Sequence, residues 1–266
     1  VYPATLNPSG MSSEYPKSLS VTSSAFRYAG INVHKRNIAA AEKIVRILLL
    51  VIFVLLSYIY CRMKNIPILF ENDEILVINK PSGVPVQGGQ GILHPLDKEL
   101  AVQAGYPVFL VHRLDRDTNG LMLVAKSAAA ASKWTKLIGG KLVRKEYTAL
   151  CVGKLSAKKG TIRTAVVQHG DEKPAVTHFQ VVDEKEIFYE DQKIVLSTVK
   201  LQLETGRMHQ IRIHLAKQGC PIAGDDKHGN FKMNKILRKA AGIKTLQLTS
   251  SRLSVPLEGR ECVFEI

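Results

Sequence analysis

The sequence predicts an α+β fold, with helices flanking a mixed, mostly antiparallel sheet. Strand-like segments rich in β-branched and aromatic residues follow one another at residues 144–155, 175–184 and 193–207. A doubly wound parallel sheet needs a crossover helix after each strand, and no regular helix separates these segments. The order of the elements therefore favours antiparallel neighbours.

Further elements are predicted on both sides of these strands. Residues 74–86, EILVINKPSGVPV, begin as a strand that ends at the Pro-Ser-Gly turn, and residues 121–125, LMLVA, have the composition of a buried strand. A helix is expected from Ser127 as its N-cap to the glycine pair at 139–140. Residues 208–219, MHQIRIHLAKQG, predict a short helix closed by glycine, and two closing strands are expected at 246–255 and 261–266.

The chain is basic along most of its length. Its 266 residues include 37 Lys/Arg and 23 Asp/Glu, a formal net charge of +14, and residues 63–266 alone hold 30 basic against 21 acidic residues. The hydrophobic fraction of 45% suffices for a core. This charge favours an anionic partner, either nucleic acid or a membrane surface. Four scattered cysteines without zinc-type spacing indicate reduced thiols in a cytoplasmic protein.

Residues 1–62 are interpreted as an N-terminal extension. Residues 1–40 are rich in Ser, Pro, Asn and Tyr without periodicity, which is typical of disorder. Residues 47–61, ILLLVIFVLLSYIYC, form an apolar run shorter than the roughly 20 residues that span a bilayer. Two interpretations stay open, translated sequence upstream of a start at Met63 or a membrane anchor. The first is preferred, so we expect a monomeric domain at 63–266 and no membrane partner.

One acidic loop stands out in the stretch HRLDRDTNGLMLVAK, residues 112–126. Its Asp115, Asp117, Asn119 and Gly120 match the first half of an EF-hand calcium loop, but Lys126 stands where that loop needs a bidentate glutamate. A calcium site is therefore not expected. What is left is Asp115 in a polar loop before a rigid strand, a common setting for catalytic groups.

Three stretches, HRLDRDTNG, RKEYTALCVG and ETGRMHQIRIHLAKQGCPIAGD, occur in this order. Together with ILVINKPSGVPVQGG they resemble the RluA-type RNA pseudouridine synthases over nearly all of residues 63–266. The resemblance implies an isomerase that converts a specific uridine of structured ribosomal or transfer RNA to pseudouridine without any cofactor or metal. No Gly-rich phosphate loop or metal-ligand cluster is visible in the sequence. Asn119 and His228 depart from the family pattern, which usually has serine and often tyrosine at these positions.

The resemblance also implies the catalytic residues. Asp115 matches the essential aspartate of the family, and whether it attacks the base or the sugar stays open. Arg212 matches the arginine that pairs with that aspartate, and a fixed cation would offset the cost of burying the carboxylate. Tyr147 matches the tyrosine that stacks on uracil and helps to remove the proton at C5.

Three further residues are candidates for binding RNA. A uridine in structured RNA must leave its stack to reach the aspartate, and Arg113 matches the arginine that occupies the vacated space in relatives. Arg207 and His209 are expected to contact RNA, and the spacing of His209 and His214 does not suit a shared metal. The alternative function is a catalytically silent RNA-binding protein of the same fold that acts in ribosome assembly.

Overall fold

The computed structural model describes residues 43–52, 65–168 and 170–266. The chain divides into two compact units, residues 1–63 and 64–266. In the first unit, residues 43–52 form a helix with exposed side chains. None of the described helices is long and apolar enough to cross a membrane. Residues 1–40, most of the apolar run at 47–61 and the expected start at Met63 lie outside the described residues, so their interpretations stay predictions.

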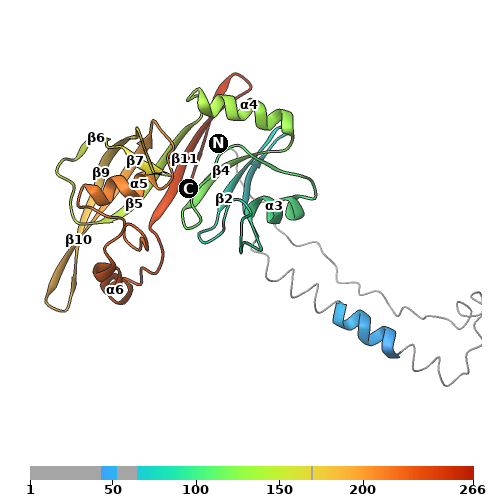
Figure 1. Cartoon of the computed structure of the whole chain (residues 1–266), viewed down its shortest axis with the longest axis horizontal. Coiled ribbons are helices and arrows are strands. Elements are labelled where there is room, and N and C mark those ends of the chain that lie inside the picture. The colour runs from blue at the N-terminus through green and yellow to red at the C-terminus, as the bar shows by residue number, and fades with distance from the viewer. Residues whose placement is uncertain (1–42, 53–64, 169) are drawn as a thin grey trace, which may run out of the picture. The chain divides into compact units, whose positions relative to one another are not determined.

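A large sheet organises residues 64–266. Its strands are β1 (Ile68–Glu71), β2 (Ile75–Lys80), β3 (Phe109–Leu110), β4 (Asn119–Ala125), β5 (Arg144–Val152), β6 (Lys159–Arg163), β9 (Val176–Tyr189), β10 (Gln192–Leu203), β11 (Leu248–Leu257) and β12 (Arg260–Glu265). The main path runs β1-β2-β4-β11-β5-β10-β9-β6, while β3 pairs with β4 and β12 pairs with β11 (Figure 1). Strands β7 (Val166–Gln168) and β8 (Asp171–Lys173) form a separate hairpin.

One pair of neighbouring strands in this sheet is parallel. Strands β4 and β11 pair in parallel, whereas the other described neighbours of the sheet are antiparallel. Strand β11 lies between β4 and β5, so it joins the half of the sheet that carries the Asp115 loop to the half that carries Tyr147.

Side chains alternate in direction along the strands, so both faces of the sheet carry buried apolar residues. On β2, Leu76 and Ile78 belong to one apolar cluster and Ile75 and Val77 to another, because successive side chains of a strand point to opposite faces. The first cluster is joined by the apolar residues of α3 (Leu96–Ala104) and α5 (Gln210–Lys217), and the second by those of α4 (Ala128–Gly139). Helix α6 (Phe231–Ala240) belongs to a smaller third cluster through Leu237.

The predicted fold class is confirmed. Helix α4 begins at the expected cap, where the Ser127 side chain accepts a hydrogen bond from the Ala130 amide at 3.1 Å. The helix expected at 208–219 is α5, which is shorter at both ends. Helices α3 and α6 were not predicted, because α3 has no side-chain cap and α6 has one fully buried residue among many polar ones.

Candidate active site

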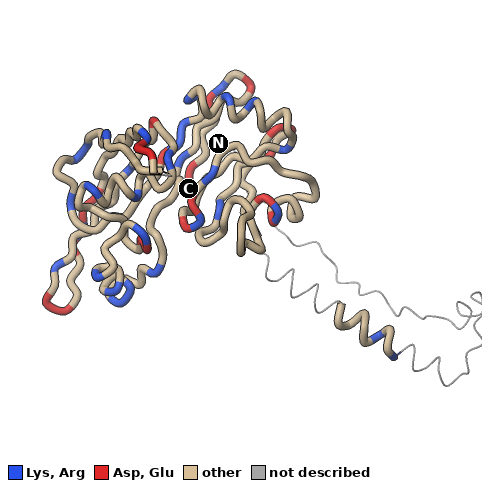
Figure 2. Tube along the Cα trace, in the orientation of Figure 1, with Lys and Arg blue, Asp and Glu red and all other residues tan. Residues whose placement is uncertain are grey.

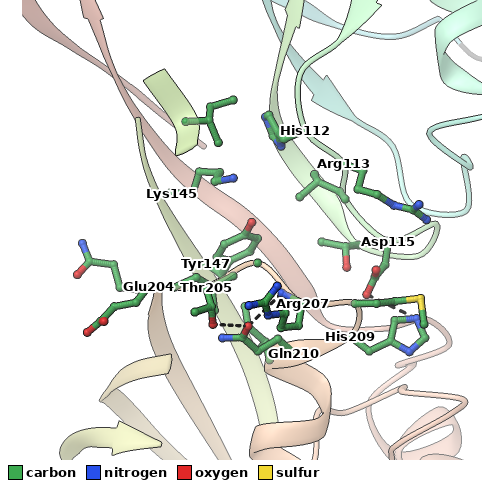
Figure 3. Close-up of a pocket in the computed structure, with 18 of the residues that line it drawn as sticks. His112, Arg113, Asp115, Lys145, Tyr147, Glu204, Thr205, Arg207, His209 and Gln210 are labelled. Atoms are coloured by element: carbon green, nitrogen blue, oxygen red, sulfur yellow. Dashed lines mark hydrogen bonds and ion pairs between the residues drawn. The ribbon is translucent and has the colours of Figure 1, made fainter. Parts of the chain in front are cut away.

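A pocket of about 880 Å³ lies where the loop before β4, the start of β5, the end of β10 and helix α5 meet. Its walls carry six Lys or Arg side chains and two carboxylates, the cations being Arg113, Lys141, Arg144, Lys145, Arg207 and Arg212. Figure 3 shows Lys145 and Tyr147 projecting from one strand, across from the loop that carries His112, Arg113 and Asp115. The pocket therefore suits an anionic ligand.

The backbone of the Asp115 loop is tied to the turn after β2. The ammonium of Lys80, fully buried, donates hydrogen bonds to the carbonyls of Arg116 and Val84 at 2.8 Å each. The Gly83 amide donates to the same Arg116 carbonyl at 2.9 Å, and the Ser82 hydroxyl donates to the Asp117 carbonyl at 2.8 Å. Three of these hydrogen bonds, from Lys80, Ser82 and Gly83, fix the main chain immediately after Asp115.

The ends of the loop are also held. His112 accepts a hydrogen bond from the Leu123 amide through Nε2 at 3.0 Å, which requires that nitrogen to be unprotonated. Burial, and secondarily the charge of Lys145, keeps the pKa of His112 well below its usual value, so the ring is neutral. Within the loop, the Thr118 amide donates to the Asp115 carbonyl at 3.2 Å, which closes a tight turn.

A close approach of two backbones fixes where β4 starts. Gly120 has φ of 109° and pairs with Ser250 of β11, and a Cβ added there would collide with the Ser250 backbone. Next to it, Asn119 accepts a hydrogen bond from the Thr249 hydroxyl at 3.0 Å. The asparagine that departs from the family pattern thus bridges β4 and β11.

Arg212 lies on α5 at the floor of the pocket and is 1% exposed. It donates from Nε and Nη2 to the two carboxylate oxygens of Asp225 at 2.8 and 2.6 Å, and from Nη2 to Asp226 at 3.3 Å. Its Nη1 atom lies 3.6 Å from Oδ2 of Asp115. Arg212 therefore adjoins Asp115, as the sequence predicts, but Asp225 is its main partner.

Tyr147 projects from β5 into the pocket and is 6% exposed, with its ring in the first apolar cluster. Burial, and secondarily the negative charge of Asp115, raises the pKa of its hydroxyl well above the usual value. The phenol is therefore protonated throughout the neutral range. Tyr147 is both a packed core residue and a wall of the site.

His209 also reaches the aspartate. Its Nε2 lies 3.8 Å from Oδ2 of Asp115, which Figure 3 shows beside it. Its Nδ1 is hydrogen-bonded to Nε2 of His228 at 2.9 Å. Burial lowers the pKa of both rings, although Asp115 acts in the opposite direction on each. His228 thus holds the ring of His209, whose other nitrogen faces the Asp115 carboxylate.

The two other candidate RNA-binding residues lie on the pocket wall. Arg113 is exposed, and its guanidinium makes no hydrogen bond or ion pair with the described residues. Arg207 is exposed and donates to the Pro174 carbonyl at 3.2 Å. The buried Gln210 accepts from the Arg207 amide at 3.1 Å and so positions this loop.

A metal site is not indicated. The described part of the chain contains no group of three or more His, Cys, Asp or Glu placed to hold a metal ion. His214 is fully buried and bonded to the Thr177 hydroxyl at 2.9 Å and the Thr164 carbonyl at 2.8 Å, so it packs inside the domain.

Sequence reasoning missed Asp225, Lys145 and Lys80. Asp225 falls within the quoted GCPIAGD stretch, and a buried arginine on an amphipathic helix needs a carboxylate partner, which is the one signal that could have found it. Lys145 lies within KEY, where no property of the isolated tripeptide distinguishes a pocket residue from a surface one.

Two solved structures that share this fold are human RNA pseudouridylate synthase domains. The human RNA pseudouridylate synthase domain containing 1 superposes with a TM-score of 0.63 at 24% identity, covering 77% of this chain and 84% of that one. The human domain containing 4 gives a TM-score of 0.59 at 26% identity, covering 75% and 87%. The fold is thus that of pseudouridine synthase domains.

The family follows from the sequence comparisons. Residues 74–217 match the RNA pseudouridylate synthase family model, and the chain belongs to that family, in its RluA-type branch. It is 35% identical over 214 residues to ribosomal large subunit pseudouridine synthase C of Salmonella typhi, covering 75% of this chain and 65% of that protein. It is 36% identical over 185 residues to synthase D of Haemophilus influenzae, covering 62% and 54%. The chain thus spans less than two thirds of the length of these curated relatives.

Proposed function

We propose that this protein is an RNA pseudouridine synthase in which Asp115 is the essential catalytic group. The observation that carries the proposal is the meeting of Asp115, Arg212 and Tyr147 in one basic pocket. A carboxylate held by a fixed backbone beside a buried guanidinium is a pre-organised charge pair, and such groups stabilise charge that develops during a reaction.

The reaction detaches uracil from ribose at N1, turns the ring and rejoins it through C5, with loss of the C5 proton and gain of one at N1. Of the two carboxylates among the described residues of the pocket wall, Asp115 is the one whose charge reaches Tyr147, and we assign to it the action on the base or sugar; Glu204 is hydrogen-bonded to His178. The charge of Arg212 supports the carboxylate throughout.

Tyr147 supplies a flat, buried surface against which uracil can stack. Its raised hydroxyl pKa disfavours an ionised phenolate at neutral pH. We therefore assign Tyr147 mainly to holding the ring during its rotation, and any part in C5 deprotonation must pass through the neutral phenol.

Arg113 has the properties needed to replace an extruded base. Its guanidinium is exposed, lies at the same pocket and is not engaged by the described residues. A planar cation can stack between the bases left behind and so offset part of the cost of flipping. His209 and Arg207 line the same wall and are assigned to contacts with the RNA strand.

Ribosomal RNA is the substrate class we favour, because the relatives named above are ribosomal large subunit synthases. Transfer RNA is the alternative substrate. Residues 63–266 contain the matched region and the whole pocket, so we assign activity to this part. We propose that it acts as a monomer. A chain that starts at Met63 should then be as active as the longer one.

The test compares wild type with Asp115→Asn. Carbodiimide primer-extension mapping of RNA from a deletion strain should lose one pseudouridine stop, which wild-type protein restores and the variant does not. The variant should bind RNA within a few-fold of wild type, since affinity rests mainly on phosphate contacts. An unchanged map in the deletion strain would favour the silent RNA-binding protein, and turnover by purified Asp115→Asn would remove Asp115 from its role.

A further inference from the structure

Lys145 is a half-buried cation on the pocket wall that the proposed chemistry does not use. Its ammonium makes no hydrogen bond or ion pair with the described residues, whereas the buried Arg212 is shared among three carboxylates. Burial lowers the pKa of Lys145, and no carboxylate offsets that effect. An ammonium held partly out of water without an acceptor is costly, and a bound anion would remove that cost.

The position of Lys145 indicates which part of the substrate meets it. Lys145 lies two residues before Tyr147 on β5, so both side chains point to the same face, about 7 Å apart along the strand. Figure 3 shows the two side chains projecting into the same space. With uracil at Tyr147, the group next along the substrate strand is a phosphodiester, which is the anion that RNA supplies.

The neighbours of Lys145 are consistent with a site for an anion. His112 senses the charge of Lys145, but its ring is neutral and cannot serve as a counter-ion. Arg144, the preceding residue, is exposed, and its one ion pair with a described residue is a 4.0 Å contact with Glu261. Among the described residues, neither pocket carboxylate pairs with Lys145, because Asp115 faces Arg212 and His209 and Glu204 is hydrogen-bonded to His178.

We propose that Lys145 binds a backbone phosphate of the RNA strand, adjoining the nucleotide whose base lies at Tyr147. That the ligand is RNA rests on the proposed function. The assignment adds that Lys145 anchors the RNA strand next to the reacting base. Because the ammonium contacts substrate and not the reacting atoms, its loss weakens binding more than turnover of bound RNA.

The experiment measures binding of an in vitro transcript of large-subunit ribosomal RNA as a function of salt. Lys145→Met should lower affinity about tenfold and reduce the slope of log K against log salt by about 0.7 to 0.9, the share of one phosphate. Lys145→Arg should stay within a few-fold of wild type. The matched control is Lys98→Met, an exposed lysine on α3 that does not line the pocket, which should stay within about twofold.

Three results would overturn the assignment. Wild-type affinity and salt slope in Lys145→Met would show that the ammonium does not contact RNA. A loss of affinity with an unchanged slope, rescued by Lys145→Gln, would indicate a contact with a base carbonyl. A loss that is matched by a lowered melting temperature would indicate a structural role.

A second probe separates this assignment from the proposed function. The ¹³Cε signal of Lys145 should shift on titration with uridine 3′,5′-bisphosphate and not with uridine, and the absence of any difference between them would overturn the phosphate site. These readouts do not depend on isomerisation. RNA that binds through Lys145 but shows no pseudouridine would refute the proposed function and leave the phosphate site standing.

Discussion

Arg212 and Asp225 form a two-point ion pair in which the side chains are 1% and 0% exposed. Asp115, 20% exposed, meets a third nitrogen of the same guanidinium at 3.6 Å. Asp225 also accepts hydrogen bonds from the amides of Lys227 and His228 at 2.9 Å each. Asp225 therefore orients the guanidinium and leaves Nη1 to face the catalytic candidate.

Removal of Asp225 should damage folding and activity together. Asp225→Ala leaves a buried guanidinium without its main partner, so the free energy of unfolding should fall by about 3 to 5 kcal/mol. Urea unfolding measures this loss. Asp226→Ala is the matched control, because Asp226 is 61% exposed and its loss should cost less than about 1 kcal/mol. Equal effects of the two changes would refute the assignment of Asp225 as the main partner.

Stability should respond to acid through the same carboxylate. Burial alone would raise the pKa of Asp225, but hydrogen bonds from Arg212 and two backbone amides outweigh it and hold the pKa below its ordinary value. A lowered folded-state pKa means that the stabilisation is complete above the unfolded value of about 3.9 and is lost as pH falls through the folded value. Unfolding free energies from pH 2 to 6 should show this loss in wild type, and it should be weaker in Asp225→Asn.

The role of Tyr147 can be divided between its ring and its hydroxyl. Tyr147→Phe keeps the buried ring, so we expect RNA affinity within a few-fold of wild type and a kcat reduced by less than the 10²- to 10⁴-fold typical of a lost general acid or base. Tyr147→Ala should lose both affinity and turnover. Because the hydroxyl pKa is raised, the rate profile of wild type should show no ionisation of Tyr147 between pH 6 and 9. An alkaline limb that disappears in Tyr147→Phe would contradict this.

Gly120 provides a test of the contact between β4 and β11. Gly120→Ala introduces a Cβ that collides with the Ser250 backbone at a positive φ, and we expect a loss of well over 1 kcal/mol. Gly91→Ala is the matched control, because Gly91 also has a positive φ, of 78°, but a Cβ there meets nothing within 4 Å. The larger fall in melting temperature expected for Gly120→Ala reports mainly the collision with Ser250. A similar loss in both would attribute the effect to backbone conformation.

The catalytic candidates were accessible from the sequence for a definite reason. Asp115, Tyr147 and Arg212 each lie in a stretch that resembles the family, and the structure places all three at one pocket. The main partner of Arg212 was not accessible, because the AGDDKHG stretch offers two adjacent aspartates and only the turn at 225–228 decides which one is buried. A sequence pattern identifies catalytic candidates one at a time. Which carboxylate pairs with Arg212 depends instead on how the folded chain packs around the guanidinium.

In the fold, too, the elements with local sequence signals were predicted and those that depend on distant contacts were not. Strands with strong alternation and the capped helix α4 were predicted, since their signals are local. Helix α6 was missed because its apolar face is weak: Lys232, Lys235 and Arg238 are exposed, and Figure 2 marks basic positions along this helix. The parallel pairing of β4 with β11 could not be predicted, because it joins residues 119–120 to 249–250 across most of the domain.

The position of β11 sets when the site can exist during protein synthesis. The Asp115 loop precedes β4 and Tyr147 lies on β5, and in the sheet these two strands are joined through β11, which comes more than 90 residues after β5. A chain emerging from the ribosome carries both residues long before the strand that joins them, and contacts this distant in sequence form slowly. The pocket that brings Asp115 and Tyr147 together is therefore expected to form only after β11 has been translated.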